Sequence, residues 1–389
     1  MDILHNTLTR LKKSKPLKGV TVAFCLHITK ETSVLVMGAK ELGANVAVCG
    51  GNPLTTQDDI AAFLATQGIH IYAWNGQTNK EYDWCIDQVL NHKPNLICDD
   101  GADMNVKVHF GKKFSSLKVL GSTEETTAGV TRVRAMEKQG KLKYPVIIVN
   151  DADTKHMFDN RYGTGQSTID GYLRAMGLLF TSKKIVVVGY GWVGRGVAER
   201  SRGMGGKVIV TEVDPVKALE AHMDGYDVMP MSQAAKIGQI FITTTGMTSV
   251  IRKEHLLAMK DGAVVGNVGH FDVEIDTKFL LEKSKSVKEV RPSLDECILR
   301  NGKKIYLVGK GRLANLVAAE GHPPEVMAQS FSNQILSLLY ILKNHKKMGK
   351  KTMVVPKEID RQIAVDALKA MNVKIDSWTK EQKKYAESW

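Results

Sequence analysis

The stretch KKIVVVGYGWVGRG, residues 183–196, decides the fold of this chain. Two lysines lead into four consecutive apolar residues, and Gly189, Gly191 and Gly194 follow with the spacing G-x-G-x-x-G. The first glycine permits a tight turn, the second lets the backbone approach a pyrophosphate, and the third lets helix and strand pack closely. The helix that follows would point its N-terminal N–H groups at the phosphates. The stretch therefore predicts a strand–turn–helix unit that binds a dinucleotide.

The next predicted strand ends in a carboxylate, which supports this interpretation. KVIVTEVD, residues 207–214, places Glu212 where a carboxylate reaches a ribose 2′-hydroxyl. A carboxylate there repels a 2′-phosphate and so favours NAD over NADP. Lys217 lies five residues further on and would suit a phosphate, but Glu212 has the placement that the fold predicts. The alternative is a glycine-rich turn in an ordinary α/β protein.

Strand-like and helix-like segments alternate along most of the chain, which predicts an α/β protein with two doubly wound parallel sheets. A second series of strands begins near Ser182. Thr55 or Thr56 is predicted to cap a helix start, and Gly43 and Gly68 to follow helix ends. The predicted strands of the first series are Val20–Leu26, Val46–Cys49, Ile69–Ala73, Leu96–Cys98, Val119–Gly121 and Val146–Val149.

A chain of 389 residues suits two domains. We expect residues 1–161 to form the first part of a substrate-binding domain and residues 162–322 to form a Rossmann NAD-binding domain. Residues 323–370 would return to the first domain, and residues 371–389 would form a short C-terminal tail. Within the returning segment, residues 325–344 predict one long, mostly buried helix, and the remainder predicts one more strand and helix.

The composition is that of a globular protein, with 43% hydrophobic and 24% charged residues. It excludes a disordered, collagen-like or disulfide-stapled chain. No stretch approaches the roughly 18 apolar residues of a membrane span, and the N-terminus lacks the pattern of a signal peptide. We expect a cytoplasmic protein. The five cysteines share no C-x-x-C spacing, so buried reduced thiols are favoured over metal ligands.

The net charge of +13 raises the question of a nucleic-acid partner. The excess comes largely from three stretches, Lys12–Lys18, Lys343–Lys351 and Lys380–Lys384. None of them is interleaved with the aromatic residues on which bases stack. We therefore expect a solvated basic surface and no nucleic-acid partner; salt-dependent retention on DNA would contradict this.

Polar clusters follow several predicted strands of the first series, at residues 27–31, 99–103, 124–127 and 150–160. In open parallel sheets ligands bind outside the carboxyl ends of the strands, so these side chains are expected to converge. Helix capping explains Asp151, Thr126 and Thr127 equally well, but it does not explain Lys155 or His27.

Two further features allow more than one interpretation. Asp99, Asp100 and Asp103 resemble a metal box, but their spacing is not that of a calcium loop and no histidine cluster accompanies them, so we expect no metal site. His270 follows the last predicted strand of the second series and is placed to face a nicotinamide; a generic buried histidine is the alternative.

Taken together, these residues resemble the S-adenosyl-L-homocysteine hydrolase (adenosylhomocysteinase) family over nearly the whole chain, in its short archaeal and thermophile-like form. The resemblance implies reversible hydrolysis of S-adenosyl-L-homocysteine to adenosine and L-homocysteine. It implies that tightly held NAD transiently oxidises the ribose 3′-hydroxyl, so that elimination and hydration can follow. It further implies a cytoplasmic homotetramer. The stretches that carry it include CLHITKET (25–32), DDGADM (99–104), EETTAGV (124–130), TKHMFDNRYG (154–163), GHFDVEID (269–276) and GHPPEVM (321–327).

The resemblance also implies roles for individual residues. Lys155 would be the base for the 3′-hydroxyl, which requires a lowered pKa, and Asp100 with His27 would move protons at C4′ and at water or thiol. Glu31 would accept a hydrogen bond from the adenine amino group. The implied catalytic residues are His27, Asp100, Glu125, Lys155, Asp159 and His270; Thr29, Glu31 and His322 also contact the substrate. The implied cofactor contacts are Thr126, Thr127, Asn160, Gly189, Gly191, Val193, Gly194, Glu212, Lys217, Asn267 and Asn315.

The sequence departs from the family pattern at a few points. Thr164 stands where many members have cysteine, and Lys217 where asparagine is common. Longer members continue past KEQKKYAESW with a tail that reaches the neighbouring subunit's NAD, so we expect that contribution to be reduced. One alternative function is an S-inosyl-L-homocysteine hydrolase, which Glu31 disfavours. The other is an inactive regulatory homologue, which the retained site residues disfavour.

Overall fold

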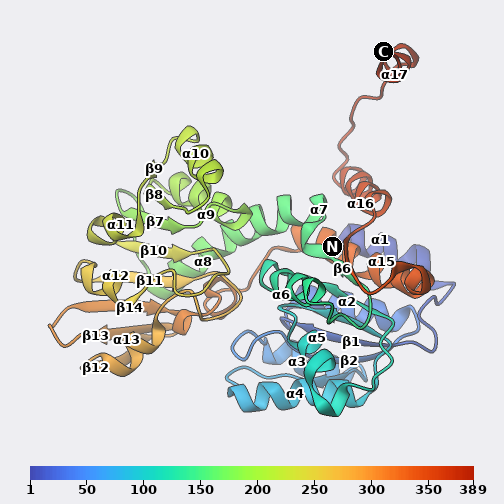
Figure 1. Cartoon of the computed structure of the whole chain (residues 1–389), viewed down its shortest axis with the longest axis horizontal. Coiled ribbons are helices and arrows are strands. Elements are labelled where there is room, and N and C mark those ends of the chain that lie inside the picture. The colour runs from blue at the N-terminus through green and yellow to red at the C-terminus, as the bar shows by residue number, and fades with distance from the viewer.

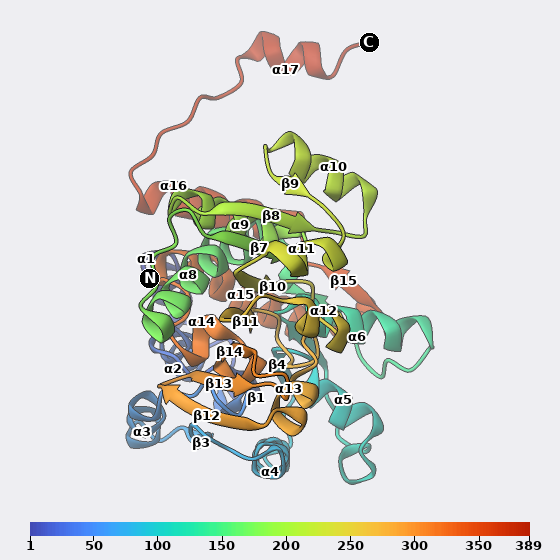
Figure 2. The same cartoon turned by 90° about the vertical axis from the view of Figure 1, so that its left-hand side faces the viewer.

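The computed structural model describes all 389 residues and contains two β-sheets that lie side by side, each flanked by helices (Figure 1). A view from the side places the second sheet and its helices in front of the first (Figure 2). This arrangement confirms the predicted α/β class. The strand order is β15-β6-β5-β4-β1-β2-β3 in the first sheet and β12-β13-β14-β11-β10-β7-β8-β9 in the second.

All strands of the first sheet run parallel. They are β1 (Thr21–Leu26), β2 (Asn45–Gly50), β3 (His70–Tyr72), β4 (Leu96–Asp99), β5 (Gly121–Glu124), β6 (Val146–Ile148) and β15 (Thr352–Val354). The helices of this half are α1 (Asp2–Lys12), α2 (Lys30–Glu41), α3 (Asp58–Thr66), α4 (Asn79–Asn91), α5 (Asp103–Phe110) and α6 (Thr127–Lys138), with 3₁₀ turns at Lys112–Phe114 and Val149–Asp151.

Strand β1 shows why both faces of this sheet need a helical cover. Successive side chains of a strand point to opposite faces, and here both sets are apolar. Phe24 belongs to a buried cluster that includes Leu338 of the long helix α15. Cys25, the next residue, belongs to the cluster on the other face, which includes Val89 of α4. Strands buried on both faces are typical of parallel sheets in α/β proteins.

The second sheet is mixed. It contains β7 (Lys184–Val188), β8 (Lys207–Thr211), β9 (Asp227–Val228), β10 (Ile240–Thr243), β11 (Ala263–Asn267), β12 (Ser286–Arg291), β13 (Leu294–Ile298) and β14 (Lys304–Val308). Strand β13 runs antiparallel to both β12 and β14, and the remaining pairs are parallel. Its helices are α9 (Trp192–Gly203), α10 (Pro215–Met223), α11 (Met231–Ile237), α12 (Lys253–Ala258), α13 (Thr277–Lys283) and α14 (Ala314–Val317), with a 3₁₀ turn at Gly309–Gly311.

Two helical segments connect the halves. The chain leaves the first sheet through α7 (Asp153–Lys155), a π-helix (His156–Gly163) and α8 (Thr164–Met176). It returns through α15 (Pro324–Met348), and β15 then pairs with β6. No helix in the chain, α15 included, has both the length and the apolar character of a membrane span.

After α16 (Lys357–Ala370) the chain extends away from both sheets to α17 (Lys380–Ala386), as both views show (Figures 1 and 2). None of the residues of α17 is buried. All five cysteines are buried and unpaired, as predicted.

The structure corrects two details of the prediction. Strands β12 to β14 form an antiparallel meander that the sequence pattern did not reveal, because every residue of β12 is exposed and its sequence lacks an apolar face. Thr55 and Thr56 do not cap a helix, since α3 begins at Asp58 after Gln57. Thr55 instead directs its hydroxyl at His27. Gly43 and Gly68 do follow helix ends, with φ of +99° and +69°.

Candidate active site

A cavity of about 1700 Å³ lies between the two sheets and is lined by residues from both halves of the chain. The segments that follow β1, β4, β5, β7 and β8 all contribute to its wall. Ligands of parallel sheets bind at this edge, outside the carboxyl ends of the strands. The volume exceeds the roughly 300–1,000 Å³ of a site for one small molecule, so the cavity has room for a dinucleotide and a second ligand.

The glycine turn after β7 has the shape that a pyrophosphate requires. Gly189 has a φ of +101°, which favours glycine, and a Cβ at Gly191 would meet no atom within 4 Å, so the backbone is open to the cavity there. A Cβ at Gly194 would lie 2.1 Å from the carbonyl oxygen of Gly189. Gly194 therefore packs α9 against the turn and does not line the cavity.

The side chains around this turn fit NAD. Glu212 follows β8 and lines the cavity, where its carboxylate accepts hydrogen bonds from the backbone N–H of Tyr190 and of Val213, both at 2.7 Å. Lys217 Nζ lies 4.0 Å from Asp214 Oδ2. Val193 and Lys217 also line this part of the wall. The helix N-terminus, the open glycine and the acidic residue together form the cradle that the sequence predicted.

Asn267 does not face the cavity, although it was predicted to contact the cofactor. Its Nδ2 donates to the carbonyl oxygens of Gly269 at 3.0 Å and Phe271 at 2.8 Å, and its Oδ1 accepts from the N–H of Gly269 at 2.7 Å. The side chain is fully buried. It holds in place the loop that carries His270.

A second group of polar residues surrounds Lys155 on the opposite wall. Lys155 Nζ lies 3.4 Å from Asp159 Oδ1 and 3.5 Å from Glu125 Oε1, and it donates to Asn160 Oδ1 at 2.6 Å. Lys155 is the last residue before the π-helix, a feature that often marks functional sites. Asn160 in turn donates to Asn150 Oδ1 at 3.0 Å.

The carboxylates of this group are held by residues that sequence reasoning missed. Ser330 of α15 donates to Asp159 Oδ2 at 2.7 Å, and Gln334 donates to Glu125 Oε2. His322, which was predicted to contact the substrate, also lies close, with its Nδ1 3.1 Å from Asp159 Oδ1. Ser330 and Gln334 are polar residues at buried positions of a helix that was predicted to be mostly buried, and that was the signal available in the sequence.

The charge on Lys155 differs from the expectation. Burial lowers the pKa of Lys155, but the neighbouring charges of Asp159, Glu125 and Asp100 outweigh burial and raise the pKa above its ordinary value. The pKa of Asp159 moves the other way: burial would raise it, but Lys155 and His322 hold it well below its usual range. The lowered lysine pKa that a base requires is therefore absent in this arrangement, because three carboxyl groups surround one ammonium.

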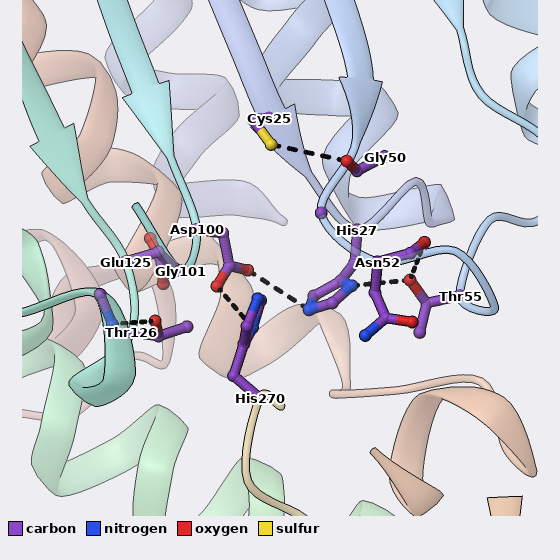
Figure 3. Close-up of polar contacts among 12 residues, drawn as sticks. Cys25, His27, Gly50, Asn52, Thr55, Asp100, Gly101, Glu125, Thr126 and His270 are labelled. Carbon is purple, nitrogen blue, oxygen red and sulfur yellow. Dashed lines mark hydrogen bonds and ion pairs between the residues drawn. The ribbon is translucent and has the colours of Figure 1, made fainter. Parts of the chain in front are cut away.

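His27, Asp100 and His270 form a third group, shown in Figure 3. His27 Nε2 lies 3.4 Å from one oxygen of Asp100, and His270 Nδ1 lies 3.4 Å from the other. The far side of the His27 ring, Nδ1, shares a hydrogen bond of 2.7 Å with Thr55 Oγ1. His27 and Asp100 follow strands of the first sheet, whereas His270 follows β11 of the second.

Burial sets the protonation of this group. It lowers the pKa of His27 well below the ordinary value, with His270 as the next cause, and it lowers the pKa of His270 to about 4. Burial and the nearby Glu125 raise the pKa of Asp100. Two neutral imidazoles therefore flank a carboxyl group that takes up a proton readily, which is an arrangement suited to proton transfer.

The same three residues are the one set of side chains placed closely enough to hold a metal ion, since their ligand atoms lie within 4.8 Å of one another. The carboxylates of Asp99 and Asp103, in contrast, bind separate partners. Asp99 Oδ2 accepts from the N–H of Asn105 at 2.7 Å, and Asp103 Oδ1 pairs with Arg132 at 2.6 Å.

Glu124 joins the two loops that carry Asp100 and the predicted NAD contacts. Its Oε1 accepts from the N–H of Gly101 at 2.9 Å and from the N–H of Thr126 at 3.1 Å. A Cβ at Gly129 would lie 2.0 Å from this oxygen, so the start of α6 is built around the carboxyl group. Thr126 and Thr127, at the same helix start, line the cavity.

The remaining predicted residues lie as follows. Thr29 caps α2 and lines the cavity, whereas Glu31 is buried in the first turn of α2 and does not line it. Asn315 and His322 both line the cavity and are 3.3 Å apart, Nδ2 to Nε2. Asn315 Oδ1 is buried without a hydrogen-bond partner and is thus available to a ligand.

Among solved structures, the fold resembles that of a dipicolinate synthase chain from Bacillus halodurans. The TM-score is 0.50 at 15% identity, with 84% of this chain and 99% of that chain covered. This likeness concerns the fold alone.

Comparison of the sequence with protein families is more specific. Residues 1–120 match the model of S-adenosyl-L-homocysteine hydrolase, and residues 160–321 match the model of its NAD-binding domain. Adenosylhomocysteinases from Saccharolobus solfataricus and Aquifex aeolicus are 54% and 53% identical, each with 100% of this chain and 93% of the relative covered. The S-inosyl-L-homocysteine hydrolase of Methanocaldococcus jannaschii is also 54% identical, with 100% and 94% covered. Their full-length similarity, together with the NAD cradle and the convergent polar groups, shows that the chain belongs to the adenosylhomocysteinase family.

Proposed function

We propose that this protein catalyses the reversible hydrolysis of S-adenosyl-L-homocysteine to adenosine and L-homocysteine, with NAD as a resident cofactor. One observation carries the proposal: a single cavity joins the NAD cradle after β7 to the group around Lys155 and to the group around Asp100. The group around Lys155 suits a sugar with two hydroxyls, because carboxylates accept and an ammonium donates hydrogen bonds. The group around Asp100 suits proton transfer.

The glycine turn after β7 and Glu212 would hold NAD, which would supply a reversible hydride acceptor for ribose C3′. The C4′ proton of the sugar would be acidic while C3′ is a carbonyl. Lys155, Asp159 and Glu125 bind and orient the 2′- and 3′-hydroxyls. Asp100 and His27 take the C4′ proton, a C4′=C5′ double bond forms as the C5′–S bond breaks, and the thiolate leaves with a proton. Water then adds at C5′, and C4′ takes a proton back. His270, neutral at physiological pH, closes the site from the second sheet. The buried walls keep bulk water from the oxidised sugar.

Lys155 needs a lowered pKa before it acts as a base. It holds a proton while the carboxyl groups of Asp159 and Glu125 lie 3.4 and 3.5 Å from its Nζ. Substrate hydroxyls that donate to these carboxylates would weaken their hold on the ammonium and so lower the pKa of Lys155. We propose that substrate binding itself prepares the base.

The purine is a separate question, because adenosyl and inosyl relatives are equally similar to this chain at 54% identity. We propose adenine on the family resemblance, which assigns Glu31 to the purine: a carboxylate accepts from an amino group and repels the oxygen of hypoxanthine. Glu31 itself does not line the cavity in this structure. Glu31 lies two residues after Thr29, which lines the cavity. Preference for the inosyl compound is the alternative function.

We further propose that residues 1–161 with 323–370 hold the substrate, that residues 162–322 hold NAD, and that residues 371–389 form a tail. A cytoplasmic homotetramer is the assembly that fits the family resemblance. An inactive regulatory role is disfavoured, because the six predicted catalytic residues are all present and line one cavity.

The purified protein is expected to release free thiol from S-adenosyl-L-homocysteine faster than from S-inosyl-L-homocysteine, in side-by-side assays with a thiol reagent. Removal of the bound dinucleotide should abolish thiol release, and added NAD should restore it. Full activity in dinucleotide-free protein would contradict the mechanism, whereas faster release from the inosyl compound would contradict only the choice of purine.

Lys155→Ala is expected to retain NAD but not to reduce it when adenosine is added, because the base for the 3′-hydroxyl is gone. The rate of nicotinamide reduction, followed by absorbance, should fall about 10²–10⁴-fold. Lys107→Ala is a suitable control, because Lys107 pairs with Asp83 and Asp87 and does not line the cavity. Normal reduction in the Lys155 variant would remove this residue from the oxidation step.

Thr55→Val is expected to lower kcat with little change in KM, because His27 loses the hydrogen bond that orients its ring. A net hydrogen bond of about 0.5–1.5 kcal/mol corresponds to roughly a two- to tenfold loss of rate. Thr56→Val is the matched control, since Thr56 is equally buried but its hydroxyl has no partner. Equal losses in the two variants would show that packing, not orientation of His27, is responsible.

The pKa of about 4 at His270 predicts a loss of stability in acid. The unfolded chain takes up a proton near the ordinary histidine value of about 6.5, and the folded chain does so only near pH 4. The free energy of unfolding contributed by this residue therefore falls as the pH drops from 6.5 to 4, by at most about 3 kcal/mol.

The measurement is denaturant unfolding across that pH range in the wild type and in His270→Gln. Asp99, whose pKa burial raises to about 6, acts in the opposite sense, because its folded form gains a proton as the pH falls. The difference between wild type and variant is therefore the quantity of interest. His222→Gln, on the exposed surface of α10, is the control. A difference that does not change with pH would contradict the prediction.

A further inference from the structure

Fifteen of the 41 lysines of this chain lie at one edge of the first sheet. Seven segments lead directly into strands of that sheet, and six of them carry lysine; the segment before β3, residues 67–69, carries none. Because the strands are parallel, their starts lie together at one edge, opposite the edge that carries the catalytic groups. We call this surface the lysine edge. It consists of residues 12–20 before β1, 40–44 before β2, 91–95 before β4, 117–120 before β5, 138–145 before β6 and 343–351 before β15.

Backbone hydrogen bonds tie these segments into one continuous border. The N–H of Val146 donates to Lys351 at 3.0 Å, and the N–H of Leu120 donates to Asn95 at 2.7 Å. The N–H of Leu17 donates to Leu42 at 3.0 Å at the other end of the border. Six neighbouring strands at about 4.8 Å spacing give a row about 24 Å wide.

The lysine edge carries the whole positive excess of the protein. Its segments contain fifteen lysines and a single carboxylate, Glu41. The whole chain has a net charge of +13, so the remaining residues carry no positive excess. Lys12 pairs with Glu41 at 2.9 Å, and no other lysine of the edge takes part in an ion pair. All of these lysines are exposed except Lys143, which is half-buried.

The residue types on this surface indicate which class of partner it fits. No large apolar side chain is exposed in any of the six segments, so the edge offers neither anchors for a membrane nor platforms on which unpaired bases stack. A row of cations alone suits the phosphates of a double helix, which carry one negative charge per about 1.7 Å of axis. A width of about 24 Å matches roughly seven base pairs at about 3.4 Å each.

We propose that the lysine edge is a binding surface for double-helical nucleic acid, which it contacts through the phosphodiester backbone without reading sequence. The separate stretches in the sequence favoured a solvated surface. The fold changes that expectation, because it joins Lys12–Lys18 and Lys343–Lys351 to four more lysine-bearing segments. The acidic groups of the active site lie at the opposite edge, so a bound duplex leaves the cavity open and does not alter hydrolysis.

The test is fluorescence anisotropy of a labelled duplex of about 30 base pairs, as DNA and as RNA, titrated with the full-length protein at about 50–200 mM salt. The wild type is expected to bind both duplexes. Its slope of log K against the logarithm of the salt concentration should be about −5, which corresponds to about five neutralised phosphates. The first variant changes Lys346, Lys347, Lys350 and Lys351 to glutamine and should flatten this slope by about three to four.

The matched control changes Lys278, Lys283, Lys285 and Lys288 to glutamine. These exposed lysines belong to the second half of the molecule, and their loss changes the net charge equally. Unchanged hydrolase activity shows that both variants are folded. A second edge variant, Lys13→Gln with Lys15→Gln and Lys18→Gln, provides an independent measurement of the salt slope. Equal losses in edge and control variants would overturn the proposal, because net charge alone would explain them. No binding at about 50 mM salt, or binding only to vesicles of phosphatidylserine, would overturn it as well.

Discussion

One buried ammonium sets the electrostatics of the active site. Asp100, Glu124, Glu125 and Asp159 are all buried near the carboxyl ends of β4 and β5 or in the helix that faces them. Carboxyl groups crowded together in a buried site cannot all ionise. Burial accordingly raises the pKa of Asp100, Glu124 and Glu125, and the pKa of Asp159 alone is lowered, with Lys155 as the main opposing cause. The number of protons in the site is therefore a property of the group as a whole.

This constraint explains why the site needs support from so many elements. A carboxyl group without hydrogen-bond partners is costly when buried. Ser330, Gln334 and the N–H of Gly101 supply partners from α15 and from the loop after β4. These partners fix the direction of each lone pair before the substrate arrives, so little reorganisation is left for the reaction itself.

The sequence predicted the parts of this structure that depend on local pattern. The glycine turn after β7 and Glu212 after β8 have fixed spacings, because a dinucleotide demands them. The convergence of His27, Asp100 and Lys155 followed from one topological rule for parallel strands. The direction in which a side chain points was not predictable in the same way. Asn267 and Glu31 occupy the expected positions in the chain, but Asn267 donates a hydrogen bond to its own loop and Glu31 does not line the cavity.

Other features depend on contacts between distant segments, and no local pattern carries them. Thr55 looked like a helix cap because threonine usually is one at such a position, yet its hydroxyl faces His27, 28 residues earlier in the chain. The strand β12 has no buried residue, so alternation could not reveal it. The lysines looked dispersed because the parallel sheet, not the sequence, brings the six strand starts together.

Gly101 shows how the two halves of the molecule become one site. Its φ of +95° and its missing side chain let His270 of the second half approach, since a Cβ would lie 2.3 Å from His270 Nε2. The N–H of Gly101 is held by Glu124 and its carbonyl oxygen by Arg132, at 2.9 and 2.5 Å. Arg132 also lies over the ring of Phe271, next to His270. The loop that presents Asp100 to the cavity is thus the same loop that receives the second half. Any shift of one half relative to the other would therefore change the distances among His27, Asp100 and His270 directly.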